Sequence, residues 1–106
     1  GQVRIAWRTP EAGREGNLGY TETFWEVDGD LTAATITMRL DWWAPREDCQ
    51  SGYDLETALL HEVGHAVGLP HSDDSAAIMY PWIPACPDLR RQLGPADIQN
   101  LRDLYR

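Results

Sequence analysis

The amino-acid sequence predicts a compact α+β domain, in which a small twisted sheet of about three strands precedes two helices. Alternating apolar and polar residues, typical of strands, occupy the N-terminal part of the chain up to Leu40. Apolar residues at helical spacing then occur in residues 55–67 and again near the C-terminus. With 106 residues, the chain is long enough for one modest core, so residues 1–106 are expected to form a single domain.

Three segments are expected to form the strands, and they are residues 2–8, 17–25 and 31–40. In the first segment the alternation places Val3, Ile5 and Trp7 on one face. Between the second and third segments, residues 27–30 contain an Asp-Gly pair, which is a common hairpin signal. A turn is therefore predicted there.

The first helix is predicted to run from Leu55 to Val67 with Asp54 as its N-cap. Its apolar positions at helical spacing are expected to form the core face: Leu55, Leu59, Val63 and Ala66. The second helix begins near Gly94 and Pro95, because proline is favoured in the first helical turn. Its apolar positions are Ile98, Leu101, Leu104 and Tyr105.

All histidines of the chain lie within residues 61–71, which read HEVGHAVGLPH. His61 and His65 are four positions apart, so on a helix they share one face. Gly68 can end the helix in a left-handed conformation and let the chain bring His71 back to the other two. The spacing H-E-x-x-H-x-x-G-x-x-H is typical of zinc peptidases and predicts one catalytic zinc bound by three histidines.

Glu62 follows the first histidine and is expected to reach the water bound to the metal. Two alternatives are weaker. Histidines in ordinary surface or core positions would not need the glutamate and glycine of the pattern. A closed structural zinc usually has a fourth protein ligand, most often cysteine, and neither Cys49 nor Cys86 lies close in sequence. A catalytic site is therefore favoured.

The net charge of −8 argues against nucleic acid and anionic membranes as partners, because both require a basic surface. The sequence also has no run of about 20 apolar residues that could cross a bilayer. Cys49 and Cys86 flank the histidine segment, and an even number of cysteines in a small secreted hydrolase favours a disulfide over two free thiols. A secreted monomer is expected.

The histidine motif and the following residues 72–81 resemble the metzincin clan of metalloproteases. Ile78-Met79-Tyr80-Pro81 resembles more narrowly the matrixins, which include the matrix metalloproteinases and their microbial relatives. The resemblance implies a zinc-dependent endopeptidase acting on extended polypeptides. A zinc-bound water would be the nucleophile, Glu62 the general base and then the general acid, and Met79 would lie in a tight turn beneath the metal.

The resemblance also implies how substrate binds. Residues 17–21 are similar to the family's substrate-binding edge strand, where a peptide would add as a further strand; an ordinary sheet edge is the alternative. Residues 80–83 would form a wall of the pocket for the side chain after the cut bond, and Thr57 is expected to line that pocket. The substrate-binding residues expected on this basis are Leu18, Gly19, Tyr20, Thr57, Tyr80, Pro81 and Trp82.

The sequence departs from the family pattern in several ways. No histidine remains for the second, structural zinc of many vertebrate members. Asp28 and Asp30 are candidate calcium ligands, although acidic turn residues are usually only solvated. The strands and helix that normally precede the first strand are expected to be absent, which suggests a compact member or a fragment. The alternatives are therefore a domain that binds zinc and peptide without turnover, and a zinc hydrolase acting on another amide.

Overall fold

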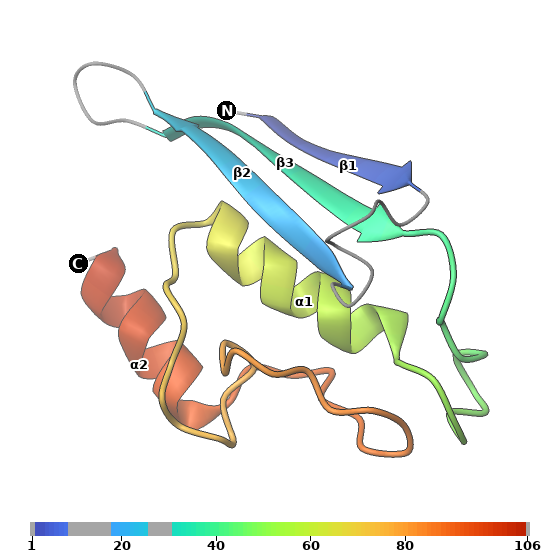
Figure 1. Cartoon of the computed structure of the whole chain (residues 1–106). Coiled ribbons are helices and arrows are strands. Elements are labelled where there is room, and N and C mark those ends of the chain that lie inside the picture. The colour runs from blue at the N-terminus through green and yellow to red at the C-terminus, as the bar shows by residue number, and fades with distance from the viewer. Residues whose placement is uncertain (1, 9–17, 26–30, 106) are drawn as a thin grey trace.

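The computed structural model describes residues 2–8, 18–25 and 31–105. Three strands and two helices follow one another along the chain (Figure 1), as the α+β prediction requires. They are β1 (Gln2–Arg8), β2 (Gly19–Trp25), β3 (Leu31–Arg39), α1 (Leu55–Ala66) and α2 (Pro95–Leu104). The turn expected at residues 27–30, with the candidate calcium ligands Asp28 and Asp30, lies outside the described residues.

The sheet has the strand order β1-β3-β2. The central strand β3 pairs in parallel with β1 and antiparallel with β2, so Ile36 lies between Ile5 and Thr21. Within the described residues, β2 has a neighbouring strand on one side only. The second predicted strand is therefore an edge strand.

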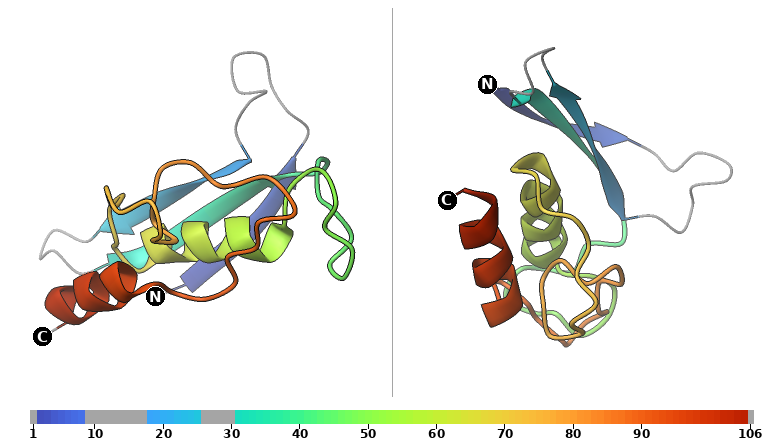
Figure 2. Two further views of the ribbon diagram at one scale, coloured as in Figure 1. Left: turned by 90° about the horizontal axis from the view of Figure 1, so that it is seen from below. Right: turned by 90° about the vertical axis from the view of Figure 1, so that its left-hand side faces the viewer.

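Helix α1 packs against β2 and β3, and α2 lies farther from the sheet (Figures 1 and 2). Small and aliphatic side chains form the core between sheet and helix: Ala34, Ile36, Met38, Ala58 and Ala66. Val63, expected in the core, is instead 37% exposed, because the inward side of α1 is shared between the sheet and the histidine cluster. Val3, Ile5 and Trp7 are also exposed, since α1 lies against the other two strands.

The ends of α1 are formed by the residues that the sequence indicated. The Asp54 carboxylate accepts hydrogen bonds from the backbone nitrogen and the hydroxyl of Thr57, at 3.0 and 2.7 Å. The same carboxylate is bound by the guanidinium of Arg91, at 2.6 and 3.0 Å. After the helix, Gly68 adopts a φ of +104°, a left-handed conformation that favours glycine.

A second core lies between α1 and α2 and contains Leu69, Ile78 and Met79. Asp97 of α2 is fully buried there and accepts hydrogen bonds from three backbone nitrogens, those of Ile78, Met79 and Gly94. The expected disulfide between Cys49 and Cys86 is present. Among the described residues, neither helix is long and apolar enough to cross a bilayer.

Candidate metal centre and cleft

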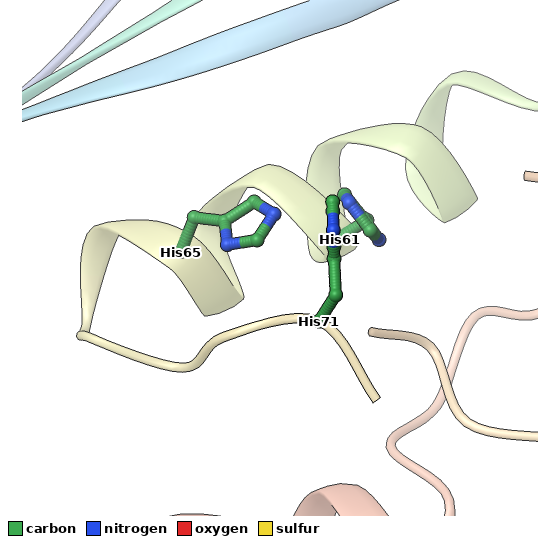
Figure 3. A group of neighbouring side chains, drawn as sticks. All are labelled: His61, His65 and His71. Atoms are coloured by element: carbon green, nitrogen blue, oxygen red, sulfur yellow. The ribbon is translucent and has the colours of Figure 1, made fainter. Parts of the chain in front are cut away.

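The fold brings His61, His65 and His71 together (Figure 3). The first two side chains extend from successive turns of α1, and the third comes from the segment that follows Gly68. One nitrogen of each ring can be chosen so that all three lie within 4.8 Å of one another. Three converging imidazole nitrogens are the type of ligand that a catalytic zinc ion binds.

Two of the rings are oriented by backbone carbonyl groups. Nδ1 of His61 lies 2.7 Å from the carbonyl oxygen of Ile78, and Nδ1 of His65 lies 2.8 Å from that of Leu69. A carbonyl oxygen only accepts hydrogen bonds, so in each ring Nδ1 carries the proton and Nε2 retains its lone pair. Both rings therefore have Nε2 available for a metal.

The surroundings of the cluster favour neutral imidazoles. Burial is the main cause that lowers the pKa of His61. Desolvation, followed by the nearby His65 and His61 rings, lowers the pKa of His71. A metal ligand must be unprotonated, so these shifts in pKa favour metal binding near neutral pH. The donor set and its protonation state thus fit zinc.

Glu62 lies beside the histidines with a side chain that is almost fully buried. Its Oε2 atom is 4.0 Å from Nε2 of His61. Its Oε1 atom accepts a hydrogen bond from the hydroxyl of Thr21 at 2.6 Å. Thr21 belongs to the edge segment 17–21 expected from the sequence, but its contact with Glu62 was not expected, because it depends on how β2 lies over α1. The period-two alternation of side chains along β2 is the sequence signal that places the side chain of Thr21 on the face toward the helix.

Met79 supports the helix turn that carries the histidines. A Cβ atom placed on Gly64 would lie 2.3 Å from Sδ of Met79, so the thioether is in direct contact with the helix backbone between His61 and His65. The carbonyl oxygen of Met79 also accepts a hydrogen bond from the backbone nitrogen of Ser72 at 2.9 Å. Met79 therefore connects α1 with the segment that contains the third histidine.

The histidines and Glu62 form the floor of a cleft of about 740 Å³. One wall is contributed by β2 and the residue before it: Leu18, Gly19, Tyr20, Thr21 and Thr23. The wall also contains Pro81, Trp82 and Ile83, and Tyr53 contributes to the lining. Tyr53 directly precedes the N-cap of α1, forms an isolated bridge with Trp43 and was not identified from the sequence.

Two expected pocket residues do not line this cleft. Thr57 is 1% exposed, and its hydroxyl bonds to Asp54 and accepts a hydrogen bond from the backbone nitrogen of Arg90 at 3.0 Å. It belongs to the cap of α1, because the segment containing Arg90 covers this side of the helix. Tyr80 is partly buried and is not among the cleft-lining residues, which include Pro81, Trp82 and Ile83.

Comparison with known proteins connects this geometry with one family. The sequence profile of the matrixin family matches residues 10–106. Metalloendoproteinase 1 of Glycine max is 39% identical over 85 residues, which cover 79% of this chain and 23% of that protein. Karilysin of Tannerella forsythia is 44% identical over 55 residues, or 52% of this chain and 11% of that protein. Matrix metalloproteinase-26 of Homo sapiens is 40% identical over 55 residues, or 52% of this chain and 21% of that protein. The matched regions thus span less than a quarter of these relatives.

Proposed function

The chain belongs to the matrixin family, and on this premise we propose that it is a zinc-dependent endopeptidase acting on extended polypeptides. The observation that carries the proposal is the arrangement of Glu62. Its buried carboxylate lies beside three converging histidines at the floor of a cleft whose wall is an edge strand. This arrangement combines a metal site, a base and a surface for an extended peptide.

His61, His65 and His71 would hold the zinc ion, the first two through Nε2. When bound, zinc supplies a Lewis acid that polarises the peptide carbonyl and acidifies the attacking water. The carbonyl groups of Ile78 and Leu69 would keep two ligands in the required tautomer. Met79 would maintain the spacing of the ligands by its contact with Gly64.

Glu62 would act first as general base and then as general acid. Its Oε2 atom is turned toward the histidine cluster and would take a proton from the attacking water. The same oxygen would then pass that proton to the leaving amine. Because the side chain is almost fully buried, few bulk water molecules compete for this carboxylate.

The substrate would bind as an additional strand along β2. Leu18 is hydrogen-bonded to Arg39 of β3, so the next residue, Gly19, turns its backbone groups to the open edge and would supply hydrogen bonds that do not depend on substrate sequence. Selectivity would then come from side-chain pockets, with Pro81 and Trp82 bounding the pocket for the residue after the cut bond. Trp82 is 76% exposed, so it has room to contact a ligand.

We also propose that the protein acts outside the cell as a monomer. The bond between Cys49 and Cys86 supports an oxidising location, since disulfides are rare in the reducing cytosol. Size-exclusion chromatography of the zinc-loaded protein tests the monomer, and a second species at working concentration would contradict it.

Cleavage of an unfolded protein such as casein tests the endopeptidase proposal. The zinc-loaded protein should cut casein, a chelator should abolish cutting, and Glu62→Ala should bind zinc without cutting. Glu56→Ala is the matched control, because Glu56 lies on the same helix, pairs with Arg46 and is not part of the cleft lining. If the unaltered protein binds zinc but does not cut, the alternative of a domain that binds zinc and peptide without turnover is supported.

A further inference from the structure

We propose that Thr21 is a positioning residue that holds the Glu62 carboxylate in its working orientation, an inference that rests on the proposed function. The Thr21 hydroxyl lies 2.6 Å from Oε1 of Glu62 and 3.1 Å from the Glu62 carbonyl oxygen. These two contacts join residues that are 41 positions apart in sequence. They connect the edge strand β2 directly with the helix that carries the candidate ligands.

The sheet register explains why this hydroxyl reaches the helix. Thr21 pairs with Ile36, whose side chain is fully buried in the core against α1. Residues paired across neighbouring strands point to the same face, so the side chain of Thr21 also points toward α1. The backbone of Thr21 remains part of β2, the strand proposed to bind substrate.

The hydroxyl has one proton and two acceptors within reach. The carboxylate oxygen is nearer than the carbonyl oxygen and carries charge, so it is the favoured acceptor. A separation of 2.6 Å is typical of a charge-assisted hydrogen bond between a hydroxyl and a carboxylate. One oxygen of Glu62 is thereby occupied by Thr21.

This hydrogen bond holds the Glu62 carboxylate in the orientation in which its second oxygen faces the histidine cluster. With Oε1 held against β2, Oε2 is the atom that faces His61, at 4.0 Å from Nε2. Without the hydroxyl, the carboxylate can rotate about its last bond, and a buried Oε1 loses its partner. Thr21 therefore acts through Glu62 and does not need to touch the substrate with its side chain.

Steady-state kinetics on three variants test the inference. Thr21→Val removes the hydroxyl but keeps the branched shape, and kcat is expected to fall about 10- to 100-fold with KM changed less than about twofold. Thr21→Ser keeps the hydroxyl and should retain kcat within about threefold. Thr35→Val is the matched control on β3, where the register places its side chain on the face of the sheet opposite α1; it should leave kcat unchanged. Equal kcat for Thr21→Val and Thr35→Val overturns the inference, and so does a fall that appears only in KM.

A measurement that does not depend on enzymatic activity tests the contact between Thr21 and Glu62 itself. In urea unfolding of the zinc-free protein, Thr21→Val should lower the unfolding free energy, seen as an increase of about tenfold in the unfolding equilibrium constant. In a Glu62→Ala background the same change should have a smaller effect, because only the backbone carbonyl oxygen of residue 62 remains as an acceptor. An equal effect in both backgrounds overturns the inference. Inactivity of the unaltered enzyme would contradict the proposed function and with it the catalytic role of Thr21, whereas full activity of Thr21→Val contradicts the role of Thr21 alone.

Discussion

Nδ1 of His61 hydrogen-bonds to the carbonyl oxygen of Ile78 at 2.7 Å, across 17 positions of sequence. The peptide segment that contains this carbonyl is held from its other side by Asp97, which accepts hydrogen bonds from the nitrogens of Ile78 and Met79 at 2.7 and 3.0 Å. A candidate zinc ligand is thus connected to α2 through a single turn of the chain. The buried carboxylate of Asp97 is expected to keep that turn, and hence the imidazole of His61, in place.

Replacement of Asp97 by alanine should destabilise the protein and weaken zinc binding together. The change leaves the buried backbone nitrogens of Ile78 and Met79, and the partly buried one of Gly94, without their acceptor. We expect a loss of about 3 kcal/mol or more in the free energy of unfolding, since each unsatisfied donor costs about 1–3 kcal/mol. Urea denaturation and zinc titration measure the two effects. Asp103→Ala, on the exposed side of α2, is the control and should cost less than about 0.5 kcal/mol. Equal losses in the two variants would contradict the role of Asp97.

Replacement of Gly64 by alanine should displace Met79. The added Cβ would lie 2.3 Å from the methionine sulfur, so one of the two side chains must move. We expect a loss of about 1–3 kcal/mol in stability, which is typical of overpacking, together with weaker zinc binding. Val63→Ala on the exposed side of α1 is the control. The cost of Gly64→Ala should shrink when Met79 is also alanine, and an unchanged cost would show that the methionine is not the obstacle.

Part of the stability that the folded protein loses in acid should come from protonation of Asp54. The hydrogen bonds from Arg91, followed by those from Thr57, lower the pKa of Asp54 from 3.8 to about 2. Because this pKa is depressed in the folded state, the contribution to stability is complete above about pH 4 and is lost as the pH falls toward 2. This contribution of Asp54 to the free energy of unfolding is about 2 kcal/mol.

Urea unfolding between pH 2 and pH 7 tests this pH dependence. Asp54→Asn retains a residue that can cap the helix but carries no charge, so its stability should vary less between pH 4 and pH 2. Asp88→Asn, whose side chain is 55% exposed, is the control and should keep the acid dependence of the unaltered protein. Parallel curves for Asp54→Asn and the unaltered protein would refute the assignment.

The disulfide should influence both stability and selectivity. Cys86 follows the cleft wall formed by Pro81 and Trp82, and its backbone nitrogen donates a hydrogen bond to the carbonyl of Gly52 at 2.9 Å. The bond to Cys49 therefore fastens the segment after the wall to the loop before α1. Loss of this cross-link, which spans 37 positions, should cost about 4 kcal/mol by the chain-entropy estimate.

Replacement of both cysteines by serine should also broaden the preference for the residue after the cut bond, because the wall is less constrained. Cleavage of a peptide library measures this preference. A non-thiol reductant should act on the unaltered protein in the same direction, whereas the double variant should not respond to it. An identical cleavage profile before and after reduction would show that the disulfide does not hold the pocket.

The sequence by itself was sufficient for the elements whose signals are local. The bounds of α1 and the N-cap Asp54 follow from residues within a few positions of one another, and so does the left-handed Gly68. The spacing of the histidines depends on one helical turn and one reversal of the chain, so their convergence was also predictable. The strands followed from period-two alternation, and their bounds agree within a few residues.

Tertiary structure alone decided which side chains face one another across elements. The contact between Thr21 and Glu62 depends on how β2 lies over α1, and the burial of Asp97 depends on how α2 lies against the turn that contains Met79. The same reason explains why Thr57 bonds to the N-cap residue Asp54 and is not part of the cleft lining, and why Val63 is exposed. Periodicity determines the face on which a residue lies, but the neighbour of that face is determined by packing between segments that are distant in sequence.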